Sequence, residues 1–179
     1  QVTKGPLLFG RNEVAMTVGS RGHLRGTADL AIRLGENVAA RINAMVTQAD
    51  NGGERIDKQG LAISLGWGIG TRDEFTASLY HLNNDNGIHY GLPWITPGAS
   101  GGNGLWTTDP GRYYGMASDV NRTGTTQAHA RHQHRLDGGG DWTTQARAGR
   151  YWRDQRASAV RFAAAAAQPD RRAVTADTF

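Results

Sequence analysis

Three histidines stand close together in the second half of the chain: His129, His132 and His134. Imidazole is a common ligand of Zn²⁺, so a metal site is the first chemistry to consider. Side chains alternate between the two faces of a strand, so His132 and His134 would share a face and His129 would point away. The chain contains no cysteine, and no neighbouring carboxylate completes a ligand set. We therefore expect no metal site.

No arrangement of residues indicates catalysis. The glycines of residues 66–70 follow the spacing Gly-x-Gly-x-Gly, but they lie on a predicted strand with no helix behind it, which argues against a dinucleotide-binding turn. The carboxylates between residues 50 and 57 lie in a polar loop without a partner for acid–base work. The sequence thus predicts no catalytic residue and no enzyme activity.

The composition fits a sheet with one apolar and one polar face. Only 38% of the 179 residues are hydrophobic, below the usual share of roughly 45–50%, yet charged residues reach only 20% and glycine accounts for 25 residues. An outer-membrane barrel needs such a sheet, because lipid surrounds it and its lumen is polar. The longest apolar stretch, residues 162–167, is too short for a membrane-spanning helix. The net charge is +4, but the arginines are scattered, so we expect no nucleic-acid partner.

Alternation of side chains predicts six strands. It is strict over residues 61–69, where Leu61, Ile63, Leu65, Trp67 and Ile69 alternate with small or polar residues. Noisier alternation predicts the other five strands, over residues 24–34, 40–46, 75–79, 127–135 and 142–152. The chain is therefore expected to be all-β.

The predicted connections alternate in length. Residues 35–37, 71–73 and 137–141 form short turns, whereas residues 49–58 and 83–124 form longer loops. Outer-membrane barrels keep short turns on the periplasmic side and long loops on the outer side. This pattern predicts a segment of an antiparallel transmembrane β-barrel.

Two tryptophans agree with a membrane-crossing strand. Trp142 and Trp152 share a face and lie ten residues apart, which is about 33 Å along an extended strand. At a tilt of roughly 40° the strand rises about 25 Å between them, close to the height of the apolar band between two aromatic girdles.

An ordered series of motifs resembles TonB-dependent outer-membrane siderophore receptors, in particular the catecholate type. Gly-Pro-Leu-Leu-Phe-Gly-Arg at residues 5–11 resembles the turn Ser-Leu-Leu-Tyr-Gly-Arg-Gly near the end of their plug domain. Arg-Gly-Thr-Ala-Asp-Leu at residues 25–30 and Ala-Arg-Ile-Asn-Ala-Met at residues 40–45 look like their first barrel strands. Tyr-Tyr-Gly-Met at residues 113–116 resembles an element of an outer loop.

This resemblance implies two parts. Residues 1–13 would be the C-terminal remnant of the plug domain. Residues 14–179 would be the N-terminal part of the receptor barrel, about 6–8 strands of a barrel that has about 22, with the long outer loop at residues 83–124. The family has Gly-Ser-Thr-Gly-Gly after the Gly-Arg pair, whereas Asn12-Glu13-Val14 here leads almost directly into a barrel-like strand. Either the plug end is shortened or the sequence is spliced there, and we expect the chain to be a fragment.

The resemblance also implies a function. The protein would lie in the outer membrane of a Gram-negative bacterium, in contact with outer-membrane lipid, and would import a ferric siderophore with energy from TonB–ExbB–ExbD. It would need no cofactor besides the transported ferric siderophore. An aromatic, anionic catecholate complex requires rings to stack on and cations to pair with. The outer loop supplies both, and its candidate substrate-binding residues are Tyr90, Trp94, Trp106, Arg112, Tyr113 and Tyr114, with Arg122 near its end.

Two other functions stay open. The chain could be a small, complete outer-membrane β-barrel with a structural or adhesin role. It could also be a soluble all-β carbohydrate-binding module that uses exposed tryptophans. In the soluble case, the apolar side of residues 61–69 would pack on another sheet. The sequence does not select one siderophore.

Overall fold

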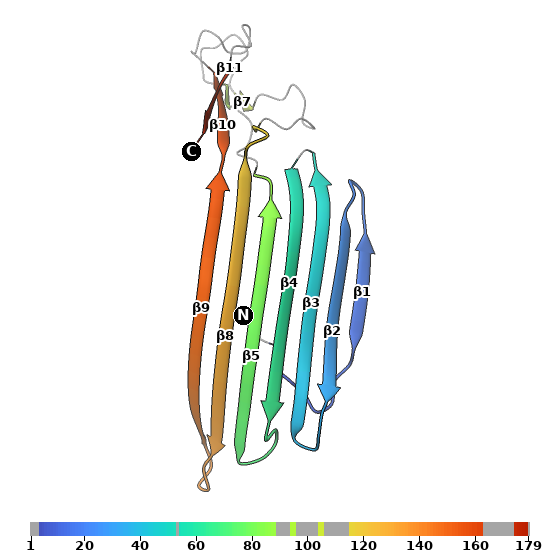
Figure 1. The fold of residues 1–179 in the computed structure, drawn as a ribbon, viewed down its shortest axis with the longest axis vertical. Coiled ribbons are helices and arrows are strands. Elements are labelled where there is room, and N and C mark those ends of the chain that lie inside the picture. Colours follow the sequence, from blue (N-terminus) through green and yellow to red (C-terminus); the bar gives the residue numbers. More distant parts are fainter. Residues whose placement is uncertain are drawn as a thin grey trace.

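Seven strands form one antiparallel sheet, and their order in the sheet follows the chain (Figure 1). The computed structural model describes residues 4–52, 54–88, 94–95, 104–105, 115–162 and 174–178. The sheet consists of β1 (Glu13–Val18), β2 (Leu24–Arg33), β3 (Val38–Asn51), β4 (Glu54–Trp67), β5 (Asp73–Asn86), β8 (Val120–Arg135) and β9 (Asp141–Arg156). Two further pairs stand outside it, β6 (Trp94–Ile95) with β7 (Gly104–Leu105) and β10 (Ser158–Phe162) with β11 (Val174–Thr178). The predicted all-β, antiparallel fold is confirmed.

One face of the sheet is apolar. Because every second side chain of a strand points to the same face, the register places like residues beside one another. The central row of this apolar face runs across six strands, through Leu30, Ile42, Ile63, Leu79, Ala128 and Ala148. In β1 the apolar face continues through Val14, Met16 and Val18.

The side chains of the apolar face are not covered by other described residues. Leu61, Ile63, Leu65 and Leu79 keep between 39% and 50% of their surface exposed. Fully burying such a side chain is worth roughly 1.5–3 kcal/mol, and part of that is forgone here in water. A contiguous exposed apolar surface marks contact with a membrane or another protein. The face thus needs an apolar covering to be stable.

A row of stacked rings bounds the apolar face towards the short turns. Trp67 stacks on Phe75 with ring centroids 5.3 Å apart, and Phe75 stacks on His132 at 4.3 Å. At the other end of β9, Trp152 lies over Gly124 of β8, in the space that a side chain at position 124 would fill. Trp142 and Trp152 lie on the same face, as predicted, because their partners in β8 are His134 and Gly124.

The connection between β3 and β4 corrects the predicted loop at residues 49–58. Asp50 pairs with Arg55 and Asn51 with Glu54, so only residues 52 and 53 separate the two strands. Gly52 has a φ of 68°, which suits glycine in a tight turn. The prediction was wrong because both faces of the strands are polar here, so the sequence does not alternate. The polar residues show where the strands leave the apolar band, but the strands stay paired beyond that point.

The long connection is likewise shorter than predicted. Residues 83–86 of β5 pair with residues 121–124 of β8, so the loop comprises residues 87–119 and not 83–124. With 16 residues each, β8 and β9 are about 54 Å long at 3.4 Å per residue. A membrane crossing needs only about 9–11 residues. The excess length is polar and lies at the loop end.

The short turns share one end of the sheet, as predicted. The turns after β2, β4 and β8 lie together at the lower end in Figure 1, and the long connection leaves from the opposite end. The predicted alternation of short and long connections holds except at the β3–β4 turn.

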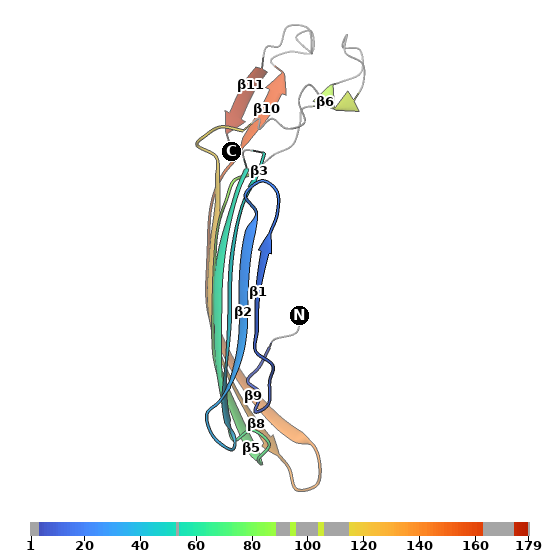
Figure 2. The same cartoon turned by 90° about the vertical axis from the view of Figure 1, so that its right-hand side faces the viewer.

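The sheet is curved, and the segment before β1 lies on the side towards which it curves (Figure 2). Within the described residues, the structure contains no helix with the length and hydropathy needed to cross a membrane.

Candidate functional site

One pair of charged groups on the polar face, Asp29 and Arg41, is largely covered. Arg41 Nε donates to Asp29 Oδ1 at 2.8 Å and Arg41 Nη2 donates to Asp29 Oδ2 at 2.9 Å, a two-pronged pair between β3 and β2. Lys4 Nζ lies 2.6 Å from Asp29 Oδ2. The Arg41 and Asp29 side chains are only 15% and 17% exposed. Such planar, two-bond recognition fixes the geometry of both groups.

The same arginine ties the sheet to the N-terminal segment. Arg41 Nη1 donates to the carbonyl oxygen of Gly5 at 3.2 Å. Pro6 lies against Gly66, where a Cβ at position 66 would come within 2.6 Å of the proline ring. The segment is therefore docked on the polar face by an ion pair, a hydrogen bond and a close backbone approach that requires glycine.

Further along, the segment makes three more contacts with β2. Asn12 Oδ1 accepts the backbone N–H of Ala31 at 2.7 Å. Gly10 packs against the side chain of Ala31, and the guanidinium of Arg33 lies 5.3 Å from the ring centre of Phe9. Residues 4–12 thus cover part of the polar face before the chain enters β1. A hollow of about 400 Å³ lies beside them.

At the loop end, charged residues connect the long strands. Asp85 of β5 pairs with Arg55 of β4 at 2.5 Å and with Arg122 of β8 at 3.2 Å. All three side chains are at least 42% exposed, so solvent screens these pairs. Arg122, predicted near the end of the outer loop, belongs to this rim at the start of β8.

A buried carboxylate ties the C-terminal end of the long loop to the first residue of β10. Asp119 Oδ1 accepts the hydroxyl of Ser158 at 2.7 Å, and Asp119 Oδ2 accepts the backbone N–H groups of Met116 and Ser158. Both Asp119 and Ser158 are buried. Asp119 therefore fixes the end of the loop where it rejoins the sheet, a role that the sequence did not reveal.

The predicted substrate-binding residues lie outside what the structure describes. Tyr90, Trp106, Arg112, Tyr113 and Tyr114 are outside the described residues, and for Trp94 only its place in β6 is described. They stay predictions. The structure does place the first residue of the loop, since the backbone N–H of Gly87 donates to the carbonyl oxygen of Arg55 at 2.6 Å.

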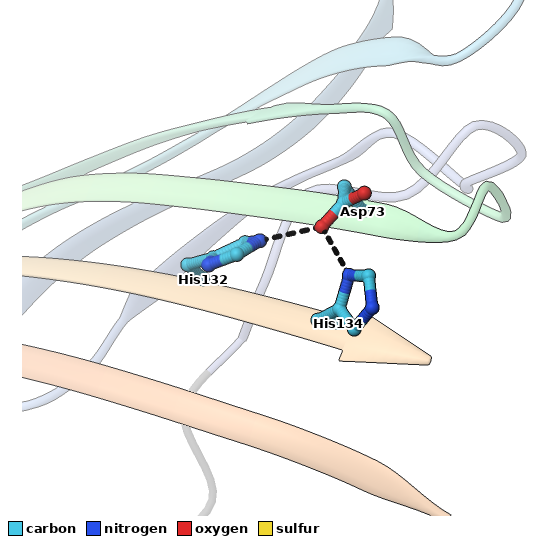
Figure 3. A group of neighbouring side chains, drawn as sticks. All are labelled: Asp73, His132 and His134. Carbon is cyan, nitrogen blue, oxygen red and sulfur yellow. Dashed lines mark hydrogen bonds and ion pairs between the residues drawn. The ribbon is translucent and has the colours of Figure 1, made fainter. Parts of the chain in front are cut away.

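The structure describes the three histidines, and it places a carboxylate beside two of them. His132 and His134 share the apolar face and His129 lies on the polar face, as predicted. A carboxylate does accompany the pair, contrary to prediction: Asp73 Oδ1 lies 2.8 Å from His132 Nε2 and 2.7 Å from His134 Nδ1 (Figure 3). The sequence reasoning missed Asp73 because it pairs with His134 only through the β5–β8 register, which bridges 61 positions of sequence.

Comparison with known proteins points to one class of receptor. No protein-family model matches the chain. The chain is similar to the catecholate siderophore receptor Fiu of Escherichia coli K12, with 24% identity over 147 residues, which cover 76% of this chain and 19% of the receptor. Fiu of Escherichia coli O157:H7 is 26% identical over the same length. The chain thus spans about a fifth of the length of the curated relatives it matches.

Solved structures give the same answer for the fold. The closed form of the ferric-catecholate import receptor Fiu from Escherichia coli K12 matches with a TM-score of 0.81 and 20% identity, covering 98% of this chain and 27% of that one. The siderophore receptor PiuA from Acinetobacter baumannii matches with a TM-score of 0.76 and 21% identity, covering 87% of this chain and 23% of that one. The resemblance drawn from the sequence motifs is confirmed, and the seven-stranded sheet has the fold of a segment of these siderophore receptors.

Proposed function

We propose that the chain forms part of an outer-membrane receptor that binds a ferric siderophore at its outer end and imports it with TonB–ExbB–ExbD energy. One observation carries this proposal: the sheet exposes an apolar band on one face, while the chain's own N-terminal segment covers part of the polar face, over β2, β3 and β4. A barrel with lipid outside and a polar, plugged lumen inside requires this arrangement, with the apolar face exposed and the polar face covered by the plug.

The contacts of the N-terminal segment suit a plug that must move. Residues 4–12 are held by hydrogen bonds, one lysine pair and small-residue packing, and not by a large apolar interface. Water can replace such contacts at a cost of about 1 kcal/mol each. We assign residues 1–13 to the end of a plug and residues 14–179 to the barrel, so import would separate these two parts along the polar face.

The proposed substrate is a ferric catecholate. The names of the relatives support this choice, and the loop between β5 and β8 carries the rings and cations that such a ligand needs. Aromatic rings stack on the catechols, and arginine neutralises the anionic iron complex. We keep Tyr90, Trp94, Trp106, Arg112, Tyr113 and Tyr114 as the candidate binding residues.

The first experiment separates the membrane proposal from a soluble binding module. The chain is expressed in a Gram-negative host with an export signal. It should be recovered from the outer-membrane fraction and require detergent for extraction. Recovery in buffer without detergent would contradict the receptor proposal and favour the carbohydrate-binding alternative.

The second experiment tests the ligand. Ferric tris-catecholate is titrated into the detergent-extracted chain, with quenching of tryptophan fluorescence as the readout. Replacing Arg112, Tyr113 and Tyr114 together with Ala should weaken binding by roughly ten- to a hundredfold, about 1.4–2.8 kcal/mol. Trp142→Phe, at the short-turn end, is the control and should leave the affinity unchanged. Equal affinities of the triple variant and the original chain would remove these three residues from the site.

A further inference from the structure

Asp73, His132 and His134 form a compact ligand set at the short-turn end of the apolar face. One potential ligand atom from each of the three residues lies within 4.8 Å of the other two. Both imidazoles aim a nitrogen at the same carboxylate oxygen, His132 through Nε2 and His134 through Nδ1 (Figure 3). We propose that these three residues bind a divalent first-row transition metal ion, with Zn²⁺ as the type.

The separations fit a metal ion after a small movement. Zn²⁺ binds imidazole nitrogen and carboxylate oxygen at about 2.0–2.2 Å, so ligand atoms of a tetrahedral site lie about 3.4 Å apart. The two nitrogens lie 2.8 and 2.7 Å from Asp73 Oδ1. These two separations must therefore lengthen by about 0.6 and 0.7 Å. Rotation of the exposed Asp73 side chain can supply this without moving the backbone.

The paired strands β5 and β8 place all three ligand residues, and ring stacking orients one of them. Asp73 is the first residue of β5 and pairs in register with His134, while His132 pairs with Phe75. The His132 ring lies parallel to the Phe75 ring, 7° between their planes, and Phe75 stacks in turn on Trp67. This stack fixes the direction of the imidazole before any ion arrives, which lowers the ordering cost of binding.

The site is open to an ion and to water. The side chains of Asp73, His132 and His134 are 44%, 35% and 31% exposed. Three protein ligands with solvent access leave a fourth position for water, the arrangement of an open zinc site. Two imidazoles favour zinc, nickel or copper, whereas magnesium and calcium prefer oxygen ligands. The Asp73 carboxylate offsets one of the two positive charges.

Metal binding would link β5 and β8, two paired strands that are far apart in the sequence. Residues 87–119 separate β5 from β8, and bringing such distant segments together costs loop-closure entropy. An ion that binds only the paired strands stabilises their pairing by mass action. The site would act as a clip that fixes the β5–β8 register. This role is independent of the transported ligand.

Protection from chemical modification tests the proposal without any substitution. Diethyl pyrocarbonate labels accessible imidazoles, and the full chain in detergent is labelled with and without ZnCl₂ and mapped by mass spectrometry. Zn²⁺ should suppress labelling of His132 and His134 about tenfold and leave His129, on the opposite face of the same strand, unchanged. Equal labelling of His132 and His134 with and without Zn²⁺, or equal protection of His129, would overturn the site.

Calorimetric titration with ZnCl₂ provides the second measurement. One ion should bind per chain, and Asp73→Asn, His132→Gln and His134→Gln should each weaken binding about tenfold or more. His129→Gln is the matched control and should bind as the original chain does. An affinity that is the same in all four variants would show that the three residues hold no ion and only hydrogen-bond to one another.

Discussion

The two faces of the sheet differ in what they leave in contact with solvent. On the apolar face, Leu61, Ile63 and Leu79 keep two fifths or more of their surface exposed. On the polar face, Asp29 and Arg41 are less than one fifth exposed and fully paired. A water-soluble sheet has the opposite arrangement, with apolar residues buried and charges in solvent. In this sheet the apolar face is the exposed one, and the charged pair of Asp29 and Arg41 is the covered one.

The largest expected effect comes from placing a charge at the centre of the apolar face. Ile63→Arg should lower the free energy of unfolding in lipid vesicles by about 2–4 kcal/mol, because a cation at the bilayer midplane has no partner. Urea titration followed by tryptophan fluorescence measures it. Ala62→Lys, the neighbouring residue on the polar face, is the matched control and should change stability by less than 1 kcal/mol. Equal costs for both substitutions would break the distinction between the faces.

The next effect concerns the ion pair of the polar face. Asp29→Asn should weaken docking of the N-terminal segment by about 1–2 kcal/mol, since Arg41 and Lys4 both lose their charged partner. Trypsin cleavage after Arg11 measures detachment and should accelerate roughly five- to thirtyfold.

The matched control for this substitution is Asp137→Asn. Asp137 pairs with Arg72 in an exposed position on a short turn, so its loss should leave cleavage after Arg11 unchanged. If Asp29→Asn gave no acceleration, the ion pair would not be what holds the segment on the polar face.

A smaller effect is expected where the proline of the segment meets the sheet. Gly66→Ala places a methyl group 2.6 Å from the Pro6 ring, and a shift of the segment should cost about 1 kcal/mol. The same cleavage assay should show roughly a fivefold acceleration with the sheet intact. Gly138→Ala, with open space around it, serves as the control. Unaltered cleavage in Gly66→Ala would mean that the segment does not rest on β4.

The smallest effect belongs to the rim. Arg55→Gln removes one partner of Asp85, but both side chains are well exposed and Arg122 stays in place. Exposed pairs contribute about 0–1 kcal/mol, so the urea midpoint should hardly move. A loss above about 1 kcal/mol would show that the rim is covered by chain and is not in solvent.

Sequence alternation predicts the strands where the two faces differ in polarity. The alternation over residues 61–69 predicts the strand correctly up to Trp67, because one face carries large apolar residues there and the other small or polar ones. Beyond the apolar band both faces meet water, so Asp50 and Asn51 look like loop although they are paired. Alternation therefore depends on whether the two faces of a strand differ in polarity, and not on whether the strand is hydrogen-bonded.

The candidate sites were harder to predict than the strands. Asp73 comes close to His134 only through a register set after a long loop, and no local pattern encodes that register. The docking of residues 4–12 has a local signal in its motif, but the motif does not say which glycine receives Pro6. The aromatic and basic residues of the outer loop stay predictions, as does the division at residue 13, although β1 begins at Glu13.

The indole of Trp152 occupies the space that a side chain at position 124 would need. The two positions are therefore complementary in volume, and one cannot grow unless the other shrinks. Among homologous sequences, residues 124 and 152 should covary: a side chain larger than glycine at position 124 should occur only where the tryptophan is lost. The position of the Trp152 ring along β9 therefore depends on glycine at position 124 of the neighbouring strand.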